Sequence, residues 1–258
     1  MSKICQNELN PDQAPAFIVG RTEQWSPGDL IYHQHTKHQL MYATRGVVHA
    51  LTAAGVWVLP PSRALWIAAG TEHALKVKRP AETKVLYVDS SASNILDHQK
   101  CTVVNVSLLV RELILACADL PWDYTINSAQ SRLSLVLIDQ LQTLNVAPVS
   151  LPNPIDSRAV HVADILRKEP SNREPLAILA QRAGASSRTI ERLFLQETQM
   201  TFGAWRHRQR LITALEFLAY GESVTNIAFE VGYESASSFV AAFREMFGTT
   251  PARYFKMN

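Results

Sequence analysis

The sequence predicts a two-domain α+β protein, in which an N-terminal β-barrel with flanking helices precedes an all-helical C-terminal domain. The chain has 258 residues, more than one compact domain usually contains. Short stretches rich in valine, tyrosine, tryptophan and leucine fill residues 17–89, whereas from about residue 106 the apolar residues recur with helical spacing. Hydrophobic residues make up 47% of the chain and charged residues 19%, which fits a globular protein and excludes a disordered one.

The predicted barrel consists of short strands bounded by glycine, proline or serine. The stretches with strand composition are residues 30–35, 38–46, 47–55, 56–63, 64–70, 73–78 and 83–89. Such short strands at regular spacing are typical of a small β-barrel or jelly roll.

Two helices are expected after the barrel, over residues 106–120 and 129–145. The second carries a leucine stripe at positions 133, 137, 141 and 144. This stripe fits packing on the protein's own barrel or packing against a second subunit. No apolar run reaches the length of a membrane-spanning helix, because Arg111 and Glu112 interrupt the richest one.

A proline-rich segment then separates the two domains. Pro148, Pro152 and Pro154 disfavour helix and stiffen the chain, so we expect a linker over residues 148–157. The domains predicted on either side are residues 1–147 and 158–258. Asp156 is placed to cap a helix that begins just after it.

The C-terminal domain contains a repeated unit, residues 175–199 and 223–248. Each unit reads as a helix, a turn with glycine, and a second helix capped by serine. Gly184 and Gly232 occupy the turns 48 positions apart, and Ser186 and Ser235 are the caps of the second helices. A single unit of this kind fits an ordinary helical hairpin, but two in tandem favour the helix-turn-helix motif that binds DNA.

The second helices carry side chains suited to the major groove. Serine and threonine hydroxyls bond base edges, methyl groups meet thymine, and arginine grips guanine. Six arginines lie within residues 182–210, against Glu191 and Glu197 alone, which makes a local basic stripe.

The runs SSRTIERLF and GYESASSFVAAFREMFGTTPARYF make the assignment more specific. With the joining stretch TFGAWRHRQRL, they resemble the DNA-binding domain of AraC/XylS-family transcription regulators over about the last hundred residues. The resemblance implies a rigid linker helix and two recognition helices in successive major grooves of double-stranded DNA. The implied DNA-binding residues are Ser187, Arg188, Thr189, Arg192, Ser237, Ser238, Ala241 and Arg244, with phosphate contacts from Arg208 and Arg210. Two positions depart from the family pattern: Gln199 replaces a usual glycine, and Phe255 replaces an arginine, which transfers one phosphate contact to Lys256.

The barrel domain has a histidine pattern of its own. His33-x-His35-x3-Gln39 and Gly70-x2-His73 resemble the two cupin motifs, with glutamine in the usual glutamate position. On a strand His33 and His35 share one face, which His73 can reach across the barrel. The four side chains therefore suggest an effector pocket, and His33, His35 and His73 alternatively suggest a divalent metal site. We expect structural roles for His38 and His49.

Together these features predict a cytoplasmic, sequence-specific DNA-binding regulator that is controlled by a small-molecule effector. The family resemblance also implies a homodimer. The alternative is a metal-dependent cupin enzyme of the oxygenase or isomerase type. No nucleophile–base pair is evident in the sequence, so we expect no catalytic residues. Cys5, Cys101 and Cys117 have no ligand-like spacing and are expected to be reduced thiols.

Overall fold

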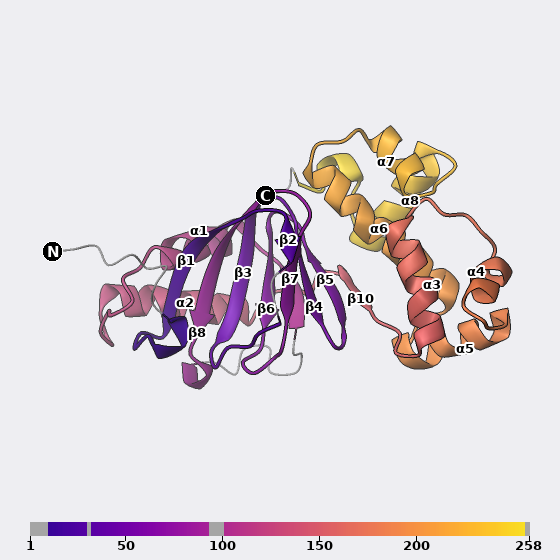
Figure 1. Ribbon diagram of the computed structural model, residues 1–258. Coiled ribbons are helices and arrows are strands. Elements are labelled where there is room, and N and C mark those ends of the chain that lie inside the picture. The colour runs from indigo at the N-terminus through magenta and orange to yellow at the C-terminus, as the bar shows by residue number, and fades with distance from the viewer. Residues whose placement is uncertain (1–9, 30–31, 93–100, 256–258) are drawn as a thin grey trace. The chain divides into compact units, whose positions relative to one another are not determined.

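The computed structural model describes residues 10–29, 32–92 and 101–255. The chain forms two compact units that divide between Val149 and Ser150, inside the predicted linker (Figure 1). We call them the barrel unit, up to Val149, and the helical unit, from Ser150; residues 53–56 group with the helical unit. Cys5 and Lys256 lie outside the described residues.

Two five-stranded sheets form the barrel. The first has the order β1 (Ile18–Trp25), β8 (Ala81–Val88), β3 (His38–Arg45), β6 (Arg63–Ile67) and β9 (Cys101–Asn105). The second has the order β10 (Ser150–Pro152), β5 (Gly55–Leu59), β4 (Val48–Thr52), β7 (Ala74–Val77) and β2 (Gly28–Asp29). The strand composition of the sequence identified β3 to β8, but it did not identify β1, β2, β9 or β10. The strand predicted over residues 30–35 is wrong for its described part, which forms only an isolated bridge at His33.

Helices α1 (Leu108–Ala118) and α2 (Ala129–Leu141) cover one face of the first sheet. Side chains alternate between the two faces of a strand. Leu40, Trp66 and Leu86 therefore point toward the helices and pack with their buried residues. Leu137 and Leu141 are fully buried in this core, and the other two leucines of the stripe pack against it. Of the two alternatives for the stripe, packing on the protein's own barrel is confirmed.

The helical unit contains both predicted motifs. Its helices are α3 (Ser157–Lys168), α4 (Leu176–Arg182), α5 (Ser187–Thr198), α6 (Phe202–Ala219), α7 (Val224–Glu230) and α8 (Ala236–Phe247), followed by the 3-10 turn η4 (Pro251–Arg253). Helices α4 and α5 form the first motif, and α7 and α8 the second. They lie at opposite ends of α6 (Figure 1), whose 18 residues span about 27 Å.

The predicted caps are confirmed at each helix start. The side chains of Asp156, Ser186, Ser223 and Ser235 each accept a hydrogen bond from a backbone N–H in the first turn of α3, α5, α7 and α8 respectively. Each bond satisfies one of the N–H groups that have no partner within the helix. The caps fix where α5 and α8, the second helices of the two motifs, begin.

The glycine-containing turns adopt the backbone conformation that favours glycine. Gly184 has φ 65° and Gly232 has φ 84°. A Cβ at Gly232 would also lie 2.9 Å from the Arg210 guanidinium carbon, so a larger residue there would displace that side chain. Gln199 ends α5 in the same left-handed region, at φ 57°, without being a glycine. Its Nε2 donates to the carbonyl of Gln196 at 3.0 Å, which holds this less favourable C-cap in place.

Candidate functional site

The first candidate site is the exposed face of α5. Ile190 and Phe194 are fully buried, so Arg188 and Arg192 lie on the opposite face, exposed to solvent. Arg192 donates to the Gln196 side chain at 3.0 Å. Within the described part of the chain, Arg188 has no hydrogen bond or ion pair. Its guanidinium group is therefore available to a partner outside the protein.

The small polar residues of α5 contribute mainly to its cap. Ser187 and Thr189 are half-buried at the start of the helix. The Thr189 backbone N–H donates to the Ser186 hydroxyl, and the two hydroxyls lie 3.0 Å apart. Any contact from Thr189 to a base would have to compete with this local bond.

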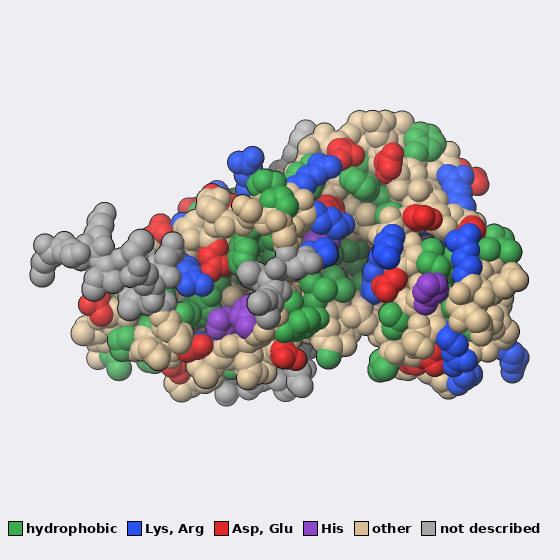
Figure 2. Space-filling view, in the orientation of Figure 1, with side chains coloured by type: hydrophobic (Ala, Val, Ile, Leu, Met, Phe, Trp, Pro, Cys, Tyr) green, Lys and Arg blue, Asp and Glu red, His purple; other side chains and the backbone are tan. Residues whose placement is uncertain are grey.

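The second candidate site is the corresponding face of α8. Phe239 and Phe243 are fully buried, and the other side of the helix is exposed. The four residues expected on that exposed side are indeed there: Ser237, Ser238, Ala241 and Arg244. The Ser238 hydroxyl donates to the Ser235 carbonyl at 2.9 Å, so it belongs to the cap. Lysine and arginine side chains are visible over the helical unit in Figure 2.

Two arginines expected to contact phosphate lie elsewhere. Both Arg208 and Arg210 are on α6 and are partly buried, and burial lowers the pKa of each. Arg210 donates to the backbone carbonyl of Asn172 at 2.7 Å, and Arg208 lies 3.4 Å from the Ser150 hydroxyl. This placement favours a role in the scaffold over a role in contacting phosphate, which remains a prediction.

Two further residues lie on the exposed face of α5. Glu191 and Leu195 follow Arg188 by three and seven positions, and both are exposed, Leu195 by 53%. Glu191 forms no ion pair or hydrogen bond with the described residues. The Glu191 carboxylate, next to two arginines, would repel phosphate groups. Its presence therefore does not fit a surface whose only role is to attract phosphate. The helical spacing is the one sequence signal that identifies these residues.

The third candidate site is a pocket in the barrel unit. Its volume is about 450 Å³. Gln39 and Tyr87 face the pocket. Their strand neighbours Leu40 and Leu86 pack against α1 and α2, and side chains alternate between the two faces of a strand. The complete lining is Arg21, Glu23, Trp25, Tyr32, His33, His35, Gln39, Leu75 and Tyr87. A pocket with apolar walls and a few converging polar groups is typical of a small-molecule site.

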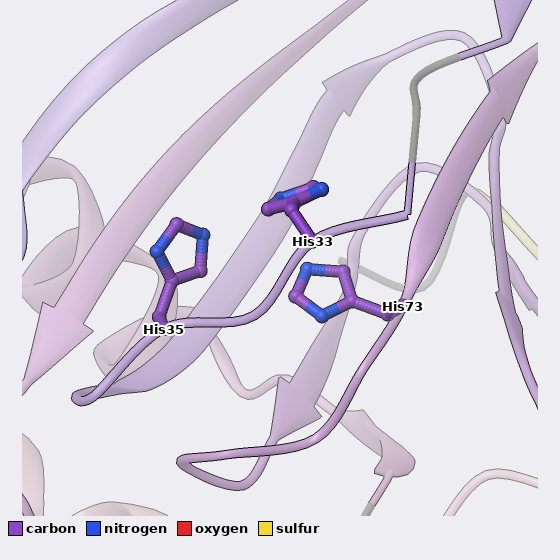
Figure 3. Close-up of side chains that lie close together, drawn as sticks. All are labelled: His33, His35 and His73. Atoms are coloured by element: carbon purple, nitrogen blue, oxygen red, sulfur yellow. The ribbon is translucent and has the colours of Figure 1, made fainter.

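Three imidazole rings meet at this pocket. His33 and His35 come from one segment and His73 from the neighbouring one, and their rings face a common space (Figure 3). Two backbone hydrogen bonds of 2.9 Å hold His33 and His73 opposite each other. The candidate ligand nitrogens of the three residues all lie within 4.8 Å of one another. The sequence prediction that these three histidines come together is confirmed.

Burial controls the charge of the cluster. It lowers the pKa of His73 from 6.5 to about 4, with His33 and His35 adding to the shift, so this imidazole is neutral at pH 7. Burial also lowers the pKa of His35, opposed by the hydrogen bond that the ring donates to the Asp12 carboxylate. Neutral imidazoles can accept a hydrogen bond from an effector or bind a divalent transition metal.

The remaining titratable groups show no catalytic arrangement in the part of the chain that is described. His38 is structural, as predicted: its Nδ1 accepts from the backbone of Ala69 at 3.0 Å, and its ring stacks on Trp66. Cys101 and Cys117 are free thiols in the core, where burial raises the pKa of both. No helix among the described residues is long and apolar enough to cross a membrane.

Comparison with known families gives one match for each unit. A model described as a helix-turn-helix domain matches residues 179–257, and one described as an AraC-like ligand binding domain matches residues 20–115.

Similar proteins are transcriptional regulators. The chain is 32% identical over 260 residues to the HTH-type transcriptional regulator NimR of Escherichia coli, with coverage of 98% of this chain and 93% of NimR. It is 37% identical over 117 residues to the HTH-type transcriptional regulator RipA of Corynebacterium glutamicum, covering 45% of this chain and 35% of RipA. Among solved structures, the DNA-binding domain of AdpA in complex with a target DNA is 27% identical, with a TM-score of 0.36, covering 40% of this chain and 89% of that one.

Proposed function

Because the chain belongs to the AraC family of helix-turn-helix transcriptional regulators, we propose that α5 and α8 are its two DNA-recognition helices and that the histidine-lined pocket binds its effector. The protein is a DNA-binding regulator with a ligand-binding domain, and not an enzyme. What remains to be assigned is which residues contact the operator and the effector.

The observation that carries the DNA assignment is the pair of exposed, unpartnered arginines on capped helices. Arg188 and Arg244 lie at exposed positions of the second helix of each motif, and neither side chain is bonded to a described residue. The apolar face of each helix is buried in the helical unit. The opposite face, which carries the arginine, is exposed to solvent. We assign base recognition to Arg188, Arg192 and Arg244. Five smaller residues would lie in close contact with the DNA: Ser187, Thr189, Ser237, Ser238 and Ala241.

The effector assignment rests on unpaired polar atoms in the pocket. Gln39 Oε1 and His35 Nε2, on two residues that line the pocket, are buried and have no hydrogen-bond partner among the described residues. Buried polar atoms without partners are costly in a folded protein. A polar effector would satisfy them, and the apolar parts of Trp25 and Leu75 would contact its carbon atoms.

We further propose that the protein acts as a cytoplasmic homodimer. The leucine stripe of α2 is occupied by the protein's own core, so another surface must mediate association. Leu108 and Leu109 on α1, with Leu135 and Val136 on α2, are 43–61% exposed. Four large apolar side chains on one pair of helices are the strongest support for an interface there.

Selection of binding sites from random DNA duplexes tests the assignment of two recognition helices. We expect two preferred blocks whose centres are about 10–10.5 base pairs apart, since helices in successive major grooves are one turn of DNA apart. Footprinting of a selected duplex should then show protection on one face. A single preferred block, or no preference at all, would contradict the two-helix assignment.

Glu191 gives a more specific prediction within the same experiment. A carboxylate accepts a hydrogen bond from the cytosine amino group, whereas a glutamine side chain pairs bidentately with adenine. Glu191→Gln should therefore change one preferred base from cytosine to adenine and leave the block bound by α8 unaltered. The matched control is Glu197→Gln, because Glu197 accepts from the backbone of Ile155 and Asp156 and lies away from this face. An unchanged preference in Glu191→Gln would remove Glu191 from the recognition surface.

A further inference from the structure

We propose that His33, His35 and His73 bind one divalent transition-metal ion, that Asp12 positions His35 for this role, and that the effector binds as a direct ligand of the ion. The last part deepens the effector pocket proposed above and rests on that proposal. The metal site itself stands on the geometry of the barrel unit alone.

The spacing of the three imidazoles suits one ion. Their candidate ligand nitrogens lie within 4.8 Å of one another. Nitrogens that bind one tetrahedral zinc at about 2.1 Å are roughly 3.4 Å apart, so small rotations of the rings bring them to bonding distance. Three nitrogen donors favour zinc, nickel or cobalt over calcium or magnesium, which prefer oxygen ligands.

The hydrogen bonds of the rings have the pattern of metal ligands. In His73, Nδ1 lies 2.9 Å from the Thr71 carbonyl oxygen, which fixes the orientation of the ring. Its Nε2 is buried without a partner among the described residues, in a side chain that is only 1% exposed. Ligand histidines in proteins bind the ion with one nitrogen and donate from the other to a carbonyl or carboxylate. A metal ion would occupy the nitrogen that the protein leaves unbonded.

His35 has the same arrangement with a carboxylate. Its Nδ1 lies 3.4 Å from Oδ2 of Asp12, and its Nε2 is buried and unpartnered within the described residues. The other oxygen of Asp12 accepts from the backbone N–H groups of Thr36 and Lys37, at 2.9 and 3.1 Å. Asp12 thus fixes both the ring and the loop that carries it, which makes Asp12 a positioning residue for the site.

The pocket leaves room for an effector on the ion. Gln39, 3% exposed, lines the same pocket as His33 and His35, and its Oε1 has no partner among the described residues. The charged residues that line the pocket, Arg21 and Glu23, pair with each other at 2.6 Å. Asp12, behind His35, would offset at most one of the two charges of a divalent ion. A net positive charge would remain, which favours an effector with an anionic oxygen or nitrogen donor. A volume of about 450 Å³ accommodates such a small chelating molecule.

Metal titration of the full-length protein tests the site. After removal of metals with a chelator, we expect one Co²⁺ per chain, with visible absorption bands that report its coordination. His73→Ala and His73→Gln should each lose the bound ion, while circular dichroism confirms that at least one of them is folded. His49→Ala is the matched control, because His49 is a partly buried histidine on β4 that does not belong to the cluster of three. Absence of stoichiometric Co²⁺, or its retention in a folded His73 variant, would overturn the proposal.

Two further measurements test the positioning by Asp12 and the direct binding of an effector to the ion. Asp12→Asn keeps an oxygen for the loop and removes the carboxylate charge from His35, so we expect Co²⁺ affinity to fall about 10-fold. An unchanged affinity would exclude positioning by Asp12.

Azide should shift the visible bands of the Co²⁺ protein if a ligand position is open, and unchanged bands would exclude direct ligation of an effector. Operator binding, measured on the same samples, separates these outcomes from failure of the DNA assignment.

Discussion

Replacement of Trp205 by alanine should lower the free energy of unfolding of the helical unit by about 3–5 kcal/mol, the usual loss for a large aromatic residue in a core. Trp205 is fully buried at the start of α6. Its ring packs edge-to-face on Phe194 of α5, with 5.2 Å between centroids, and its Nε1 donates to the carbonyl of Pro152 at 2.8 Å. The substitution therefore leaves a cavity between α5 and α6. It also leaves the Pro152 carbonyl without the hydrogen bond from Trp205.

Guanidinium unfolding of the full chain, followed by far-ultraviolet circular dichroism, measures this loss. Phe229→Ala is the matched control, because Phe229 is an aromatic residue of the same unit that is 52% exposed. We expect the control to change stability by less than about 0.5 kcal/mol. A loss below about 1 kcal/mol in Trp205→Ala would show that the residue does not hold α5 against α6.

The double substitution Arg188→Ala with Arg244→Ala should greatly weaken operator preference, leaving only the discrimination that Arg192 and the smaller side chains supply. Each guanidinium that grips guanine contributes about 1–3 kcal/mol of discrimination, so both together account for about 2–6 kcal/mol, or roughly 30-fold to more than 10,000-fold in affinity. The two residues lie on different helices, so we expect their effects to be additive. Binding to unrelated DNA should weaken much less, because the other basic residues of the unit remain.

Fluorescence anisotropy with a selected duplex and a scrambled duplex, at fixed salt, gives both affinities. Arg132→Ala is the control for loss of an exposed arginine, since Arg132 lies on α2 in the barrel unit. If the double variant still prefers the selected duplex by the wild-type ratio, base recognition belongs to other residues. Each single variant should then identify which of the two blocks depends on which helix.

The repeated motif was predictable from the sequence because its determinants are local. Ser186 and Ser235 bond to backbone within their own first turn, and Gly184 and Gly232 have the positive φ angles that a glycine in such a turn indicates. Local signals of this kind do not depend on the rest of the fold. The family resemblance added the expectation that the two motifs form one DNA-binding domain.

Features that depend on contacts between residues distant in the sequence were predicted less completely. The leucine stripe of α2 identified a buried face, but periodicity does not specify what covers that face, and the protein's own sheet does so. The phosphate contact that the family resemblance implies for Arg210 stays a prediction, but the bond from its guanidinium to the Asn172 carbonyl required the fold. Strand β9 was missed because a five-residue apolar stretch has no period of its own.

The histidine cluster was predictable as a set of residues but not in its bonding. The motif spacing groups His33, His35 and His73, although His33 forms only an isolated bridge and not part of a strand. That Asp12 and Thr71 hold the rings by Nδ1 required the fold, since Asp12 lies 23 residues before His35 in the sequence. Such long-range hydrogen bonds have no signature in composition or spacing.

The arginines around Asn172 have a consequence for how the protein would respond to sequence changes. Arg206 and Arg210 of α6 both donate to the Asn172 carbonyl, and the guanidinium of Arg210 also contacts Gly232 in the turn of the second motif. Next to it, Arg173 donates to the carbonyl of Tyr233 at 2.8 Å. The entry to one motif and the turn of the other are thus thermodynamically coupled. Substitutions at these two places, although distant in sequence, would show non-additive energies.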